Sequence, residues 1–225
     1  MKKIISICLR LIVFLSSFLG VGLCFFSSSL DFMGGSTSLL YFTNQSNIWI
    51  GLTCLVFVIL DIINLIKKTN YSYKWLYIVK YIFTVSITLT GVVFCFVLAP
   101  TMKSGAWTLI NILTHVIVPV CSIVDLFIDR HPVRYNYKHY LFTIIPPLYY
   151  LVFAAICYVK DVKFGYGVNY PYFFLNWDSP AGVFGFSSTM PYFMGTFYWI
   201  IVLLIFVVLV AFLYAKLINK KQKSN

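Results

Sequence analysis

The chain has 225 residues, of which 61% are hydrophobic, 20% are aromatic and only 10% are charged, and its mean hydropathy is +0.90. Soluble globular domains carry about 25% charged residues, so this composition excludes that class and indicates an integral membrane protein. The net charge of +11 fits attraction to anionic lipid headgroups, and we expect no nucleic-acid partner.

Six apolar segments are long enough to cross a bilayer, which takes about 20 residues. The first follows Lys2 and Lys3 as a secretion signal would, but it is too long and no small-residue cleavage site follows it, so we interpret it as a span. The sequence therefore predicts an all-α membrane protein, with residues 1–225 forming one six-helix transmembrane domain. The predicted spans are 5–26, 39–66, 75–99, 107–128, 140–159 and 193–217.

Lysine and arginine residues are concentrated at one end of these spans, which predicts the cytoplasmic side. If the N-terminus lies inside, the outer side carries only Lys103, Lys160 and Lys163. Both termini are then cytoplasmic. Because richness in Lys, Ile, Asn, Phe and Tyr is typical of AT-rich bacterial genomes, we expect a multi-pass protein of the bacterial cell membrane.

The sequence shows no signature of a metal or cofactor site. All six cysteines fall inside apolar spans, where we interpret them as packing residues, and there is no CxxC motif, no His and Cys cluster and no Gly-rich phosphate loop. We therefore expect neither a metal nor a cofactor.

The second span opens with the polar stretch YFTNQSN, in which Thr43, Ser46 and Asn47 share one helix face. A threonine near a helix start is most often a cap or bonded to its own backbone. A threonine hydroxyl is also a nucleophile when a neighbouring base takes its proton, and a neutral imidazole is the usual base.

The fourth span carries His115 within the apolar run TLINILTHVIVPVCSIV. Ionisable groups at bilayer depth are costly and usually face a bundle interior, where they have a function. One stripe at helical spacing joins this histidine to polar neighbours toward both ends of the span: Thr108, Asn111, Ser122, Asp125 and Asp129.

Depth along the two spans brings the threonine and the histidine together. At about 1.5 Å per residue, Thr43 lies roughly 6 Å and His115 roughly 12 Å inward from the outer end. We expect the two to meet in the outer half of the bundle, as nucleophile and base. The side chains expected to orient the imidazole or to donate to an oxyanion are Asn44, Ser46, Asn47 and Asn111. The alternative is an interhelical hydrogen bond that only holds the bundle together.

Two aspartates lie toward the inner ends of their spans. For Asp61 and Asp125 the ordinary explanation is pairing with Lys67, Lys68 or Arg130, and the alternative is a proton path that runs from Asp125 past His115.

The outer link between spans five and six is long and aromatic, running about 30 residues from Lys160 to Tyr192. A loop this apolar is expected to lie in the outer interface and to fold partly over the bundle, either as a lid or as an aromatic belt. The residues predicted to bind substrate or to form the lid are Tyr170, Tyr172, Phe174 and Trp177.

Three short motifs resemble those of the bacterial six-pass Pr6Pr membrane proteins: YFTNQSN in span two, THVIVPV-x-x-x-x-D in span four and YPYFFLN in the last outer loop. More distantly they resemble the eukaryotic androgen-induced membrane proteins, a group with threonine hydrolases that act on fatty acid esters of hydroxy fatty acids. The resemblance implies a lipid-ester hydrolase in which Thr43 is the nucleophile and His115 is the base.

Two other classes of function stay open at the level of sequence. In a small-solute, ion or proton transporter, His115 and the aspartates relay charge, although the prolines of spans four and five have no counterparts in spans one and two. In a noncatalytic scaffold, the polar stripe only joins helices. The expected partners are membrane lipids and a lipid ester substrate.

Overall fold

The computed structural model describes residues 2–27, 33–102 and 105–223, and this part of the chain is helical with no strand. Within it, six helices are long and apolar enough to cross a membrane, which confirms the predicted number of spans. Their bounds are Lys2–Phe26, Phe42–Lys67, Lys74–Thr101, Leu109–Ile128, Tyr137–Val159 and Thr196–Lys223.

The first, second and last of these are continuous helices: α1 (Lys2–Phe26), α2 (Phe42–Lys67) and α8 (Thr196–Lys223). The connections at the end opposite the chain termini contain short 3₁₀ turns, η1 (Ser36–Leu40), η5 (Gly165–Gly167) and η6 (Phe173–Leu175).

The third, fourth and fifth spans are interrupted. The third consists of α3 (Lys74–Val93), the π-helical turn η2 (Phe94–Leu98) and the 3₁₀ turn η3 (Ala99–Thr101). The fourth consists of α4 (Leu109–Ile112), the π-helical turn η4 (Leu113–Ile117) and α5 (Val118–Ile128). The fifth consists of α6 (Tyr137–Phe142) and α7 (Ile145–Val159).

Proline residues account for these interruptions, because proline has no N–H to donate to the preceding turn. Pro119 follows the π-helical turn of span four, and Pro100 follows that of span three. Pro146 and Pro147 stand in the first turn of α7, where the missing donors are tolerated.

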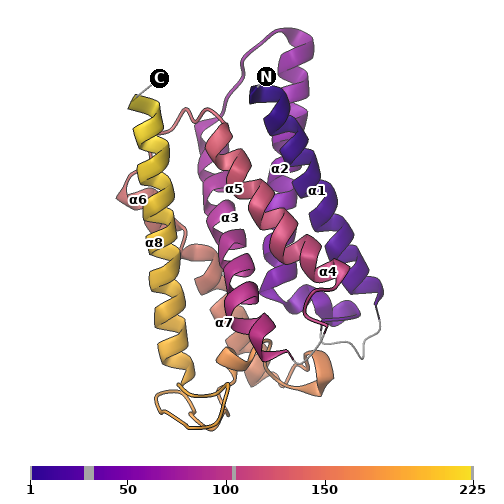
Figure 1. Cartoon of the computed structure of the whole chain (residues 1–225), viewed down its shortest axis with the longest axis vertical. Coiled ribbons are helices and arrows are strands. Elements are labelled where there is room, and N and C mark those ends of the chain that lie inside the picture. The colour runs from indigo at the N-terminus through magenta and orange to yellow at the C-terminus, as the bar shows by residue number, and fades with distance from the viewer. Residues whose placement is uncertain (1, 28–32, 103–104, 224–225) are drawn as a thin grey trace.

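The helices run alternately up and down, so that both chain termini lie at one end of the bundle (Figure 1). α1 packs along α2 and α5, and α3 packs against α2 and α5 on one side and against α7 and α8 on the other. The lysines and arginines assigned to the inner side by sequence lie toward the end with the termini, whereas Lys160 and Lys163 follow α7 at the opposite end. Lys103 lies outside the described residues. Which end faces the cytoplasm stays a prediction.

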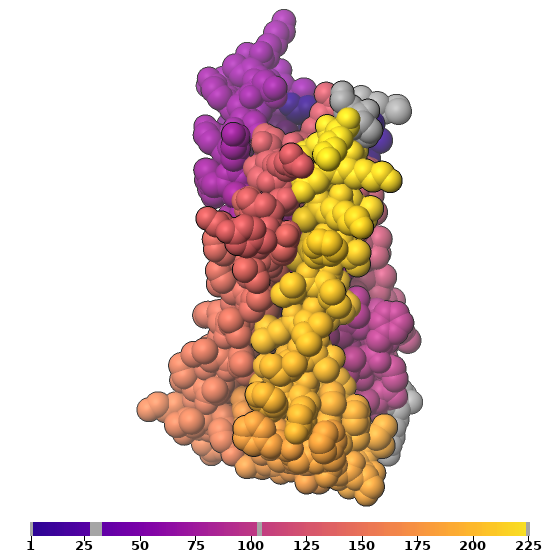
Figure 2. All heavy atoms as spheres, turned by 90° about the vertical axis from the view of Figure 1, so that its left-hand side faces the viewer, coloured from indigo at the N-terminus to yellow at the C-terminus, as the bar shows by residue number. Residues whose placement is uncertain are grey.

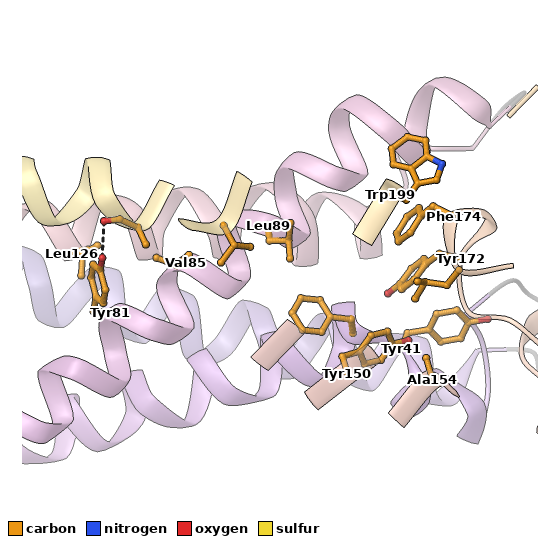
Figure 3. Close-up of a cluster of buried hydrophobic side chains, with 14 of the residues drawn as sticks. Tyr41, Tyr81, Val85, Leu89, Leu126, Tyr150, Ala154, Tyr172, Phe174 and Trp199 are labelled. Carbon is orange, nitrogen blue, oxygen red and sulfur yellow. Dashed lines mark hydrogen bonds between the residues drawn. The ribbon is translucent and has the colours of Figure 1, made fainter. Parts of the chain in front are cut away.

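The interior of the four-helix group α1, α2, α3 and α5 contains an apolar layer. It consists of Val13, Ile50, Cys54, Ile87 and Val118, all buried. A larger core cluster joins α3 to α7, α8 and the outer loop. In Figure 3 its aromatic members Tyr41, Tyr150, Tyr172, Phe174 and Trp199 gather at one end, and the Tyr81 hydroxyl donates to the Ala211 carbonyl at the other, 2.6 Å away.

Small residues allow close helix packing beside His115. A Cβ atom on Gly91 would lie 2.9 Å from the His115 carbonyl oxygen, and one on Gly20 would lie 2.5 Å from Cγ2 of Thr114. Both distances are shorter than van der Waals contact, so the approach of α1 and α3 to span four depends on glycine.

We expect Gly20→Ala to lower the free energy of unfolding by about 1–3 kcal/mol, because the added methyl group clashes with Thr114 in a packed interior. Gly22→Ala is the matched control in the same helix, since a Cβ there has no neighbour within 4 Å and alanine favours the helix. Unfolding of the purified variants in mixed micelles measures the free energy of unfolding of each. Equal stability of the two variants would contradict the packing argument.

A buried ionic cluster lies at the end of the bundle that carries the termini. Arg10, which is 1% exposed, donates to Asp61, Asp125 and Asp129, with Nε 3.0 Å from Asp125 Oδ2. Lys80 Nζ lies 2.6 Å from Asp125 Oδ2 and 3.1 Å from Asp129 Oδ2.

The predicted pairing of Asp61 and Asp125 with Lys67, Lys68 or Arg130 is therefore wrong. The cations come from α1 and α3, which helix packing brings beside the carboxylates, whereas the predicted partners follow the aspartates in sequence at the helix ends. This cluster ties α1, α2, α3 and α5 together.

Candidate functional site

Thr43 stands in the first turn of α2, one residue after the helix begins at Phe42. Its side chain does not cap the helix, because the N-cap position is Tyr41 and no side-chain cap bond is formed there. Instead Oγ1 lies 3.3 Å from Nε2 of His115 and 3.3 Å from the hydroxyl of Tyr172. The threonine is 4% exposed, so these contacts lie inside the bundle.

His115 lies in the π-helical turn η4 and is 3% exposed. Its ring stacks on Phe94, with centroids 3.9 Å apart and planes 20° from parallel. Phe94 begins the other π-helical turn, η2, so both members of the stack come from widened helical turns, which are frequent at functional sites.

The neighbours of Nδ1 fix which nitrogen of His115 carries the proton. Nδ1 lies 3.2 Å from the Asn111 carbonyl oxygen, which can only accept. It also lies 3.0 Å from Thr114 Oγ1, whose own proton is donated to the Ile110 carbonyl at 2.8 Å. Both neighbours therefore accept from an Nδ1–H. In the neutral ring Nε2 is then the acceptor, and it faces the Thr43 hydroxyl.

Tyr172 closes the other side of Thr43. The Thr43 backbone N–H donates to the Tyr172 hydroxyl at 3.2 Å, and the tyrosine ring stacks on Phe174 with centroids 5.1 Å apart. Burial raises the pKa of Tyr172 to about 12, so the hydroxyl keeps its proton at neutral pH. It is a hydrogen-bond donor beside Thr43 Oγ1.

The four supporting polar residues predicted from sequence hold the backbone near the site. Asn47 Nδ2 donates to the carbonyls of Thr43 and Thr114, at 2.8 and 3.2 Å, and Ser46 donates to the Thr43 carbonyl at 3.0 Å.

The remaining two also bond to backbone carbonyls. Asn44 Nδ2 donates to the Ser38 carbonyl at 2.8 Å, and Asn111 Nδ2 donates to the Ala106 carbonyl at 2.9 Å. Asn111 reaches the imidazole only through its own carbonyl. These bonds set the position of the Thr43 turn against span four.

A largely apolar cavity with an empty volume of about 670 Å³ adjoins Thr43. Leu89 and Val93 of α3, Leu151 of α7 and Leu203 of α8 line it, and polar groups are contributed by Thr43, Thr90 and the two tyrosines Tyr150 and Tyr172.

The aromatic outer loop divides into two parts with respect to this cavity. Tyr172 and Phe174 line the cavity, and Figure 3 shows both rings in the aromatic group that includes Tyr150. Tyr170 instead lies with its hydroxyl 3.3 Å from that of Tyr192, and Trp177 packs on Tyr158 with centroids 5.1 Å apart. Of the predicted lid residues, only Tyr172 and Phe174 line the cavity.

Two residues of the site were missed by sequence reasoning. Thr114 immediately precedes His115, and neighbouring residues of a regular α-helix point in different directions, so their contact was not expected. Phe94 carries no polar atom and is one of many phenylalanines, so only packing identifies it. The sequence signal for these two residues was the pair of prolines, Pro100 and Pro119, that follow the π-helical turns.

The fold defines an all-helical, multi-pass membrane protein with a buried Thr, His and Tyr group beside an apolar cavity. Among the described residues no group of His, Cys, Asp and Glu is arranged to hold a metal ion. Comparison with protein-family models, with curated proteins and with solved structures gives no match. The chemistry of the site is therefore argued from its own residues.

Proposed function

We propose that this protein is an intramembrane hydrolase of lipid-like esters, with Thr43 as the nucleophile and His115 as the general base. The observation that carries the proposal is the 3.3 Å contact between Thr43 Oγ1 and Nε2 of a histidine whose Nδ1 is held by two acceptors. This is the nucleophile, base and orienting group of covalent catalysis. Thr43 also borders the apolar cavity, which fits an acyl group.

The reaction follows from this arrangement in two steps. Thr43 Oγ1 attacks the ester carbonyl carbon while its proton passes to His115 Nε2, and the bond to the alcohol oxygen then breaks as the imidazolium returns the proton to that oxygen. In the second step water attacks the acyl-threonine, His115 takes the water proton and then delivers it to Thr43, and the carboxylic acid leaves. No cofactor enters either step.

The oxyanion of the tetrahedral intermediate has two sources of stabilisation near Thr43. The Tyr172 hydroxyl is a donor 3.3 Å from the nucleophile. Thr43 also lies in the first turn of α2, where the helix dipole favours negative charge.

The substrate class is supported by the character of the cavity and by the motifs. An almost entirely apolar wall excludes polar substrates, and membrane lipids are the nearby source of acyl esters. The resemblance of YFTNQSN and THVIVPV-x-x-x-x-D to the Pr6Pr and androgen-induced membrane proteins favours the same assignment. We propose the bacterial cell membrane as its location, with both termini cytoplasmic.

The packing disfavours transport through the bundle. The apolar layer of Val13, Ile50, Cys54, Ile87 and Val118 lies between the Thr43 site and the ionic cluster, as the order of residues along spans two, three and four indicates. A proton or ion path from Asp125 to His115 has to cross this layer. A noncatalytic scaffold is the remaining alternative, and a labelling experiment distinguishes it.

The test is covalent labelling of the purified protein with a fluorophosphonate probe directed at serine and threonine hydrolases. We expect the wild type to be labelled and Thr43→Ala to lose labelling, because the attacking oxygen is gone. Thr53→Ala is the matched control, since Thr53 lies on the same helix and donates only to the Trp49 carbonyl. Equal labelling of wild type and Thr43→Ala would contradict the assignment of the nucleophile.

A further inference from the structure

A second cavity lies at the end of the bundle that carries the termini, between the last turn of α5 and the last turns of α8, and its empty volume is about 660 Å³. Arg130, His131, Lys221 and Gln222 contribute its polar wall, and Ile218 is among its apolar residues. Figure 2 shows the last turns of α8, in yellow, at the end of the molecule opposite the orange loop that precedes this helix.

The charge around this cavity is positive. Lys221 Nζ donates to the carbonyls of Phe127 and Ile128, which holds its ammonium group at the end of α5. Arg130 is exposed, and its guanidinium forms no hydrogen bond or ion pair with the described residues.

The other polar groups of the wall do not cancel this charge. Among the described residues that line the cavity, Asp129 is the only one with a carboxylate, and it is engaged by Arg10 and by Lys80, the latter at 3.1 Å. Burial lowers the pKa of His131 to about 4, so this ring is neutral at pH 7. Gln222 also lines the cavity, and its side-chain amide donates to the carbonyls of His131 and Val133.

The surface that leads to the cavity is suited to a lipid. Leu213, Leu217 and Lys221 follow one another at intervals of four residues, so they form a single stripe on α8. The two leucines are each 53% exposed in a helix that is long and apolar enough to cross a membrane, so their side chains are accessible to lipid acyl chains. A lipid whose chain lies along this stripe places its phosphate at the level of Lys221 and Arg130.

We propose that this cavity binds the phosphate headgroup of an anionic membrane lipid, with Arg130 and Lys221 as its donors. Basic pockets between membrane helices on one side of the bilayer are suited to anionic headgroups. Arg130 supplies a planar fork for two phosphate oxygens, and Lys221 supplies a fixed point charge. The site is separate from Thr43 and does not depend on the proposed hydrolase activity.

The test is thermal unfolding of the full chain in uncharged detergent, titrated with dioctanoyl phosphatidylglycerol, dioctanoyl phosphatidylcholine or inorganic phosphate. We expect phosphatidylglycerol to raise the melting temperature in a saturable manner and at lower concentration than the other two. Arg130→Gln is expected to weaken phosphatidylglycerol binding by at least about tenfold, because charge-assisted hydrogen bonds to the headgroup are lost.

Arg134→Gln is the matched control, because it removes the same charge from an exposed position in the same connection that does not line the cavity. It is expected to keep wild-type affinity. Equal weakening by the two variants would show a nonspecific surface effect and would overturn the proposal. Wild-type affinity of Arg130→Gln for phosphatidylglycerol would also overturn the proposal. The same holds if the wild type binds phosphatidylcholine or inorganic phosphate as tightly as it binds phosphatidylglycerol.

Discussion

Replacing His115 by glutamine is expected to slow probe labelling of Thr43 by about 10²–10⁴-fold, the usual contribution of a positioned general base. Glutamine fills much of the same space but cannot accept a full proton from the threonine hydroxyl. The reason to expect a large effect is the fixed tautomer, since Nδ1 is held by Asn111 and Thr114 and Nε2 is left as the acceptor. The second-order rate constant of probe labelling measures the effect of this replacement.

His139→Gln is the control for this experiment. His139 lies at the third position of α6, where its side chain accepts from the Asn136 backbone N–H as part of a capping box. Glutamine serves the same position in a capping box, so stability and labelling are expected to stay near wild type. If His115→Gln is labelled as fast as His139→Gln, His115 is not the base.

Replacing Arg10 by methionine is expected to lower the free energy of unfolding by about 3–5 kcal/mol, which is the usual cost of removing one partner from a buried ion pair. The guanidinium contacts Asp61, Asp125 and Asp129 at once. The remaining cations are Lys80 and the exposed Lys3, which lies 3.9 Å from Asp61, and these two cannot neutralise three carboxylates. Unfolding in mixed micelles measures the loss.

Two further variants separate charge from packing. Adding Asp61→Asn to Arg10→Met removes one of the stranded charges and is expected to restore part of the stability. Lys163→Met breaks only the exposed pair with Asp161 and is expected to change stability by less than about 1 kcal/mol. A loss for Arg10→Met no larger than that for Lys163→Met would show that the cluster does not stabilise the bundle.

The Thr43 site and the ionic cluster have different physical settings. Thr43, His115 and Tyr172 are neutral partners beside a cavity, whereas Arg10 and its carboxylates are charged groups that compensate one another. The cluster fixes the four helices at one end, and the site occupies the other end beyond the apolar layer. The Thr43 site is therefore separated from the charges of the ionic cluster.

The sequence alone determined the class of protein and the number of spans, because an apolar run of about 20 residues has one stable form in a bilayer, a helix that satisfies its own backbone. It also indicated Thr43 and His115 as a pair. Both lie in apolar spans that run in the same direction, so their depths are comparable from residue numbers alone.

Only the tertiary structure decided which side chains meet around that pair and around Asp125. Thr114 and Phe94 reach His115 through widened π-helical turns, and Arg10 reaches Asp125 across 115 positions in sequence. Helical periodicity assigns a residue to a face of its own helix, but it does not say which neighbour that face meets. That choice depends on close packing at positions such as Gly20 and Gly91, which the pattern of polar and apolar residues does not encode.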